Sequence, residues 1–164
     1  MAKKEKMLED LFHETLKDIY YAEKKILTAL PKMAKAAQSG DLQAAFEKHE
    51  GETTDQVERL EQIFELMKHP AKGKTCDAIN ESQQVMKEFK GSAALDAGLI
   101  ASAQAVEHYE ISRYGTLKAW AEQLGLQQAV SLLDETLEEE KKTDEALTEL
   151  AKTAVNQKAQ QAAE

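Results

Sequence analysis

Apolar residues recur at gaps of three and four along four long stretches of the chain. The first two stretches run over about Leu8–Ala37 and about Leu42–Lys68. The other two run over about Ala93–Leu124 and about Gln127–Ala154. This spacing places the apolar side chains along one face of an α-helix. The sequence therefore predicts four long amphipathic helices and an all-α fold.

Short breaks join these helices in pairs. Ser39–Asp41 separates the first two and Gly125 separates the last two, which makes each pair an antiparallel hairpin. The link between the hairpins is longer and contains a predicted short helix over about residues 76–89. A link of this length can cross the bundle, as the single long crossover of ferritin-like four-helix bundles does. Residues 1–164 are expected to form one domain, with a polar tail that frays after about residue 156.

The four apolar faces are expected to meet in one core. The helix-forming residues Ala, Leu, Glu, Lys and Gln dominate the composition, and the prolines are Pro31 and Pro70. Because proline interrupts helices, two prolines leave room for long ones. The core residues expected from the four helices are Leu16, Ile26, Phe46, Leu60, Val106, Leu117, Leu133 and Leu147.

Charge and composition narrow the classes of partner. The formal net charge is -9, so the chain repels phosphate backbones and nucleic acid is not expected as a partner. No apolar run approaches the roughly 20 residues that cross a bilayer, so no membrane partner is expected either. Cys76 is the single cysteine, which precludes an internal disulfide and agrees with a cytoplasmic location.

One glutamate lies within the apolar stripe of each long helix. Glu23 and Glu52 occupy this position in the first hairpin, and Glu110 and Glu139 occupy it in the second. Each pair is separated by 29 residues, and a shift of 87 residues carries the first hairpin onto the second. This repetition indicates a duplicated hairpin. If the hairpins pack face to face, the four glutamates meet near the middle of the bundle.

Four carboxylates cannot all stay ionised in a dry core, because desolvation and mutual repulsion raise their pKa values. Two divalent cations would neutralise them, and carboxylates are suitable ligands for such a pair. The predicted site is therefore a di-metal centre. The alternatives are a hydrated polar layer and a register that places some of the glutamates at the surface. Tyr20, Tyr109 and Tyr114 are candidate hydrogen-bond donors to this layer, or they pack as ordinary amphipathic residues.

Further polar residues accompany the four glutamates. His49 lies one turn before Glu52 and is a candidate outer ligand or an ordinary core histidine. Glu107 is a candidate fifth ligand or a surface residue, and Glu140 offers an alternative register to Glu139. The complete set of predicted metal-site residues is Glu23, Glu52, Glu110, Glu139, Gln56, Glu107, Glu140 and Thr143.

Four segments of the sequence resemble one protein family. They are YAEKKIL at Tyr21–Leu27, HEGETTDQVERLEQIF at His49–Phe64, AQAVEHYEISRYGTL at Ala103–Leu117 and LLDETLEEEKKTDEALTELA at Leu132–Ala151. They are similar to segments of the YciF-type stress-induced ferritin-like proteins of bacteria, and the resemblance covers roughly Leu8–Lys158. It implies a ferritin-like bundle, often a homodimer, that is linked to stress responses and has no settled biochemical activity.

The resemblance also implies roles for the glutamates. In ferritin-like proteins two helices each contribute a glutamate, and the other two each contribute a Glu-x-x-His pair. Glu23 and Glu110 match the first role. Glu52 and Glu139 match the second only in part, because neither is followed by the histidine. An oxygen-rich site suits iron or manganese as the two divalent ions, and it is also compatible with magnesium or calcium.

Two functions follow as hypotheses. The first is a stress-associated metal protein that handles iron or peroxide at the di-metal site, with enzymatic turnover left open. The second is a non-catalytic stress or interaction protein whose polar core is vestigial and metal-free. A homodimer is expected in either case, because the family is often dimeric and because Trp120 and the crossover helix leave apolar surface on a slim bundle.

Overall fold

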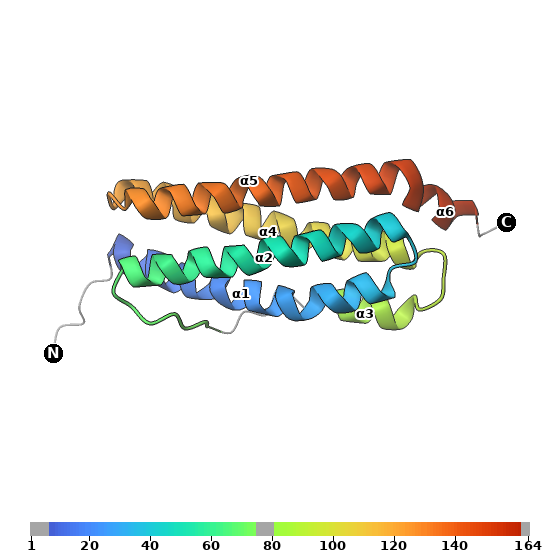
Figure 1. Ribbon diagram of the computed structural model, residues 1–164, viewed down its shortest axis with the longest axis horizontal. Coiled ribbons are helices and arrows are strands. Elements are labelled where there is room, and N and C mark those ends of the chain that lie inside the picture. Colours follow the sequence, from blue (N-terminus) through green and yellow to red (C-terminus); the bar gives the residue numbers. More distant parts are fainter. Residues whose placement is uncertain (1–6, 75–80, 162–164) are drawn as a thin grey trace.

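Four long helices lie side by side in the computed structural model of the chain, which describes residues 7–74 and 81–161 (Figure 1). They are α1 (Leu8–Ala36), α2 (Gly40–Leu66), α4 (Leu95–Gln123) and α5 (Gln127–Leu150). Helices α1 and α2 form one antiparallel hairpin, and α4 and α5 form the other. Contacts of α2 with α5 and of α1 with α4 close the bundle. Every regular element within the two described ranges is helical, which confirms the predicted all-α fold.

The described parts of the connection between the hairpins begin at the end of α2 and resume near the opposite end of the bundle (Figure 1). The connection contains α3 (Glu81–Glu88), which packs against α4 and α1. The stretch before α3 is tied to α1 by a hydrogen bond of 3.1 Å from the Lys74 N–H to the Lys17 carbonyl oxygen. The bundle thus has the single long crossover typical of ferritin-like folds. The beginning of the predicted crossover helix, with Cys76, lies outside the described residues.

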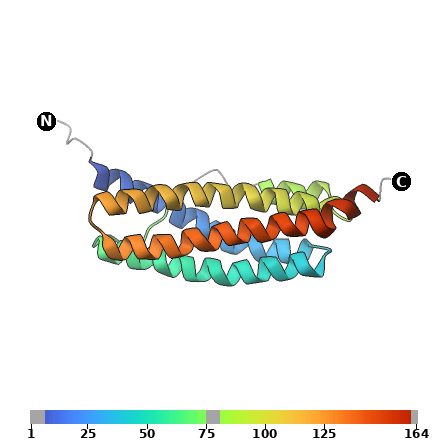
Figure 2. The same ribbon diagram turned by 90° about the horizontal axis from the view of Figure 1, so that it is seen from above.

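The C-terminal segment differs from the sequence-based expectation. A π-helical turn, η1 (Ala151–Val155), follows α5 and leads into a short helix, α6 (Asn156–Gln161). The chain therefore stays helical to residue 161, where the sequence predicts a frayed tail after about residue 156. Val155, the last residue of η1, accounts for this difference, because its side chain is buried in the second apolar cluster directly before α6. Helix α6 continues the chain beyond the end of α5 (Figure 2).

The interior consists of two apolar clusters separated by a polar layer. The first cluster fills the half of the bundle that contains the α4–α5 turn, and the second fills the half beside α3. Of the eight core residues predicted from the sequence, seven are buried and Val106 is half-buried. None of the described helices is long and apolar enough to cross a membrane.

Replacing Leu60 or Leu117 by alanine should lower the free energy of unfolding by about 2–5 kcal/mol, because either change leaves a cavity in the first apolar cluster. Both side chains are almost completely buried. Urea unfolding measures the loss, and Leu66→Ala, at an exposed position of α2, is the control. A loss below roughly 0.5 kcal/mol at both buried positions would contradict this helix register.

The homodimer stays a prediction. Trp120 packs against the first apolar cluster, so it offers less surface to a partner than the sequence suggests. Among the described residues, the exposed large apolar side chains are Met7, Leu11, Leu66 and Phe89. Light scattering at high micromolar concentration should give twice the chain mass of 18.3 kDa. A value equal to the chain mass would show that the protein is a monomer.

Candidate metal centre

Four glutamates are buried in the polar layer between the two apolar clusters. Glu23 comes from α1, Glu107 and Glu110 come from α4, and Glu140 comes from α5. None of the four side chains is more than 2% exposed. Glutamate is almost never fully buried unless it is paired. Their burial therefore suggests that the layer binds a positively charged partner.

Helical geometry explains how two of the helices present these acids. Glu107 and Glu110 are three residues apart, so both project from the same face of α4. Leu133, Leu137 and Glu140 follow one another at gaps of four and three residues along the buried face of α5. The apolar stripe of α5 therefore leads directly to Glu140.

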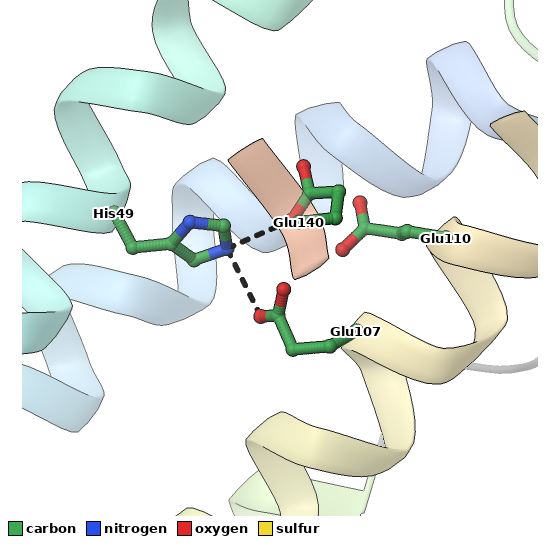
Figure 3. Close-up of side chains that lie close together, drawn as sticks. All are labelled: His49, Glu107, Glu110 and Glu140. Atoms are coloured by element: carbon green, nitrogen blue, oxygen red, sulfur yellow. Dashed lines mark ion pairs between the residues drawn. The ribbon is translucent and has the colours of Figure 1, made fainter. Parts of the chain in front are cut away.

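Helix α2 contributes a histidine and two uncharged polar residues at this level. They are His49, Thr53 and Gln56, each at most 4% exposed. The Nε2 atom of His49 lies 3.1 Å from Oε1 of Glu107 and 3.9 Å from Oε2 of Glu140 (Figure 3). The imidazole thus faces the carboxylates of α4 and α5 from across the bundle.

Four of these side chains converge on one point. One ligand atom from each of His49, Glu107, Glu110 and Glu140 lies within 4.8 Å of the others. Imidazole nitrogen and carboxylate oxygen bind transition metals at about 2.0–2.2 Å. An ion placed among the four atoms can therefore reach them with small rotations of the side chains.

Most polar atoms of the cluster have no hydrogen-bond partner within the described chain. The unpaired atoms are both oxygens of Glu110 and Glu140, both ring nitrogens of His49, and one oxygen each of Glu23, Glu52, Gln56 and Glu107. The His49 ring is nevertheless within ion-pair distance of Glu107. Buried polar atoms are nearly always paired. So many free acceptors around one point call for a cation or for shared protons.

The surroundings disfavour ionised carboxylates. Burial raises the pKa of Glu23 to about 7 and raises the pKa values of Glu110 and Glu140 well above their ordinary range. Neighbouring carboxylates act in the same direction, since Glu23 lies beside Glu110 and Glu107 lies beside Glu140. Without a cation, the cluster therefore keeps protons at neutral pH.

Tyr114 supports the Glu23 carboxylate. Its hydroxyl, fully enclosed in the core, donates a hydrogen bond to Oε1 of Glu23. Burial and the charge of Glu23 raise the pKa of Tyr114 well above its usual value, so the hydroxyl stays protonated and remains a donor. This leaves Oε2 of Glu23 as the free atom of that carboxylate.

Glu52 lies at the rim of the cluster. Its side chain is 24% exposed and is hydrogen-bonded by Lys48. His49 and Lys48 lower the pKa of Glu52 to about 2. Burial by itself would lower the pKa of His49, but the carboxylates of Glu107 and Glu52 raise it well above its usual value. Thr53, about 100° further round α2, takes the inward place that the sequence predicts for Glu52.

Glu139 is turned away from the cluster, contrary to the sequence-based expectation. Arg59 binds its two carboxylate oxygens at 2.7 and 2.9 Å, and Nε2 of Gln56 donates to it at 3.1 Å. The inward position belongs to Glu140, because adjacent helical residues differ by about 100° and the stripe through Leu133 passes through Glu140. The sequence pattern does not predict the pairing of Arg59 with Glu139, because arginine is common at partly exposed helix positions.

The remaining predicted residues occupy different places. Glu107, for which the sequence leaves a surface position open, is buried in the cluster. Gln56 is also fully buried, and because its nitrogen serves Glu139, its oxygen is the free acceptor. Thr143 is half-buried one turn beyond Glu140. The structure thus brings together Glu23, Glu107, Glu110 and Glu140 with His49 and places Glu139 outside. Glu52 lies at the rim, with its buried Oε2 atom 3.8 Å from Nδ1 of His49.

Comparison with known proteins gives close relatives. Residues 7–160 match the family described as a domain of unknown function, DUF892. Protein YciF of Escherichia coli (strain K12) is 46% identical over 160 residues, which cover 94% of this chain and 96% of that protein. The crystal structure of the E. coli stress protein YciF has a TM-score of 0.87 at 45% identity, over 93% of this chain and 99% of that chain.

Two further solved structures share the fold. YcfI of Rhodopseudomonas palustris has a TM-score of 0.79 at 42% identity, over 90% of this chain and 97% of its own. A protein of Xanthomonas campestris has a TM-score of 0.75 at 21% identity, over 94% of this chain and 97% of its own, which is a likeness of fold alone. The family match and the identity to YciF both span nearly the whole chain. The chain therefore belongs to the DUF892 family, and its resemblance to the YciF-type proteins is confirmed.

Proposed function

We propose that the buried carboxylate cluster binds divalent metal ions and that this is the biochemical function of the bundle. The observation that carries the proposal is the group of His49, Glu107, Glu110 and Glu140, whose ligand atoms converge while most remain unpaired. A metal ion accepts electron pairs from such atoms without needing donor hydrogens. It would also offset the cost of burying several negative charges together.

Charge balance supports two ions. The four buried glutamates carry four negative charges when ionised, and two divalent cations supply four positive ones. The convergent group would hold the first ion. The free oxygens of Glu23 and Gln56 are the ligands available to the second, while Tyr114 keeps the other Glu23 oxygen oriented.

The ligand set favours iron(II) or manganese(II). One imidazole among several carboxylates mixes a nitrogen donor with hard oxygen donors, and both of these metals accept that combination. When iron is bound, it supplies one-electron chemistry with peroxide or dioxygen. The protein would contribute a closed, apolar setting and residues that hold the carboxylates in place.

The stress-related role is part of the same proposal. The E. coli relative with a solved structure is named a stress protein. We propose that the present chain likewise serves under stress by handling iron or peroxide. The alternative role is a non-catalytic stress or interaction protein, and YcfI is a relative for which a structural role has been suggested. The contact of His49 with Glu107 favours this alternative, because a charged imidazole partly compensates the acids without metal.

Iron(II) under anaerobic conditions, or manganese(II), should raise the melting temperature of chelator-treated protein, because the ion binds only the folded site. Glu140→Gln should abolish this gain. Glu139→Gln should keep it, because Glu139 is bound by Arg59 outside the cluster. Calorimetry of the three proteins, with and without metal, measures the effect.

Three results would bear against this assignment. If neither metal shifts the melting temperature of the wild type, the metal-binding proposal fails. If metal fails to raise the melting temperature of both Glu140→Gln and Glu139→Gln, the helix register that places Glu140 inward and Glu139 outward is contradicted. If Glu140→Gln stabilises the metal-free protein while metal has no effect on the wild type, the layer is held by shared protons, as the alternative role requires.

The metal-free protein should lose stability as the pH rises from about 5 to about 8. The pKa of Glu23 is about 7 in the folded state against an ordinary value of 4.5. Between these values the folded state binds more protons than the unfolded state, so the free energy of unfolding falls with rising pH. A shift of this size corresponds to about 3 kcal/mol. The raised pKa of His49 acts in the same direction above its ordinary value.

Thermal melts of chelator-treated protein across this pH range measure the dependence. Glu23→Gln should make it shallower without abolishing it, because glutamine does not titrate while Glu110, Glu140 and His49 still do. Glu122→Gln, at an exposed position of α4, is the control and should leave the slope unchanged. A wild-type melting temperature that increases from about pH 5 to about pH 8 would contradict protonation of the buried cluster.

A further inference from the structure

A small apolar cavity lies beside the carboxylate cluster, in the half of the bundle next to α3. Its volume is about 30 Å³. Helices α1 and α4 form most of its wall, and Ser82 of α3 and Ser102 of α4 are the two hydroxyl residues that line it. The apolar residues of the lining are Ile26, Ala29, Leu30, Met33, Ala103 and Val106.

The cavity reaches the cluster. His49 and Glu107 line it, and the same two residues belong to the group whose ligand atoms converge. Both are buried, whereas Ala29 and Val106 in the same lining are half-buried. The cavity therefore lies between half-buried residues near the bundle surface and two residues of the buried cluster.

Its size and polarity restrict the occupant. One water molecule needs about 10–15 Å³, so this cavity admits a molecule of about two heavy atoms. Apolar cavities tend to stay dry and accept apolar gases. Hydrogen peroxide fits less well, because its hydroxyl groups would lose hydrogen bonds to water along an apolar wall. The lining thus favours an apolar diatomic molecule.

The wall beside α3 is tightly packed. A Cβ atom added to Gly98 of α4 would lie 2.7 Å from Cγ1 of Val85 on α3. This separation is too short for a side chain, so glycine lets α3 approach α4 closely. The hydroxyl of Ser102 is meanwhile bonded to the Gly98 carbonyl oxygen at 3.0 Å, which leaves fewer free polar groups facing the cavity.

We propose that this cavity is the route by which dioxygen reaches the metal centre. The inference rests on the proposed function, because the route has a destination only if the cluster binds metal. Dioxygen would pass the alanine and valine side chains of the outer wall and meet the metal on the side of His49 and Glu107. Two experiments test this proposal: one asks whether the cavity binds an apolar gas, and the other asks whether small molecules reach the metal through it.

Xenon tests the cavity without any metal. Crystals of the wild-type protein pressurised with xenon should bind an atom between α1 and α4, because xenon occupies dry apolar cavities. Ala103→Leu adds three carbon atoms to the buried wall and should exclude it, and Ala29→Leu should narrow the outer part. Ala105→Leu, at an exposed position of α4, is the matched control and should leave xenon binding unchanged.

Nitric oxide tests the route to the metal, since it is an apolar diatomic molecule of similar size whose complex with iron(II) is detected by absorbance and electron paramagnetic resonance. In anaerobic iron(II)-loaded protein, its association should be about tenfold slower in Ala103→Leu or Ala29→Leu than in the wild type, because binding then requires the wall to open. The amount of bound iron(II) should be the same in all variants. Ala105→Leu should react at the wild-type rate.

The outcomes are distinguishable. Equal nitric oxide rates in variants that bind iron(II) and exclude xenon would overturn the route and leave the metal site intact. Absence of xenon from the wild-type cavity would also overturn it. If the wild type binds no iron(II), the proposed function fails, and the route fails with it even where xenon is bound.

Discussion

The burial of four carboxylates in the middle of a narrow bundle is the constraint on which the rest of the structure depends. Each carboxylate loses its water shell, and no arrangement of four negative charges in a dry layer is favourable by itself. The two apolar clusters on either side of the layer supply the compensating stabilisation. Every long helix passes through both clusters, so the layer is closed by apolar side chains at both of its ends. Folding and the charge state of the layer are therefore linked.

Positive charge is distributed unevenly around this layer. Arg59 and Lys48 neutralise Glu139 and Glu52 at the rim, where water also screens the charges. Inside the layer, His49 is the basic side chain that contacts the buried acids. Each of these rim acids thus has its own cationic side chain beside it, whereas the buried acids Glu107 and Glu140 both face the ring of His49. This difference separates residues that hold the helices together from residues suited to bind a cation.

The two hairpins have kept a common backbone plan and diverged in their inner side chains. Glu23 and Glu110 are related by the 87-residue shift and are both fully buried. The same shift relates Thr53 to Glu140, so one hairpin has a hydroxyl where the other has an acid. With His49 on the first hairpin, most of the acids lie on one side of the bundle and the imidazole lies on the other.

The sequence by itself determined the helices, their pairing into hairpins and the burial of Glu23 and Glu110, because gaps of three and four residues fix which face of each helix is apolar. Only the tertiary structure decided between neighbouring residues such as Glu139 and Glu140. An apolar face is broad enough to include either residue, and the two differ by about 100° around the helix axis. The choice depends on how far α5 is rotated against its neighbours and on Arg59 of α2, which binds Glu139 from outside. Convergence of His49, Glu107, Glu110 and Glu140 at one point likewise depends on three helices at once, and that information is not contained in the pattern of any one of them.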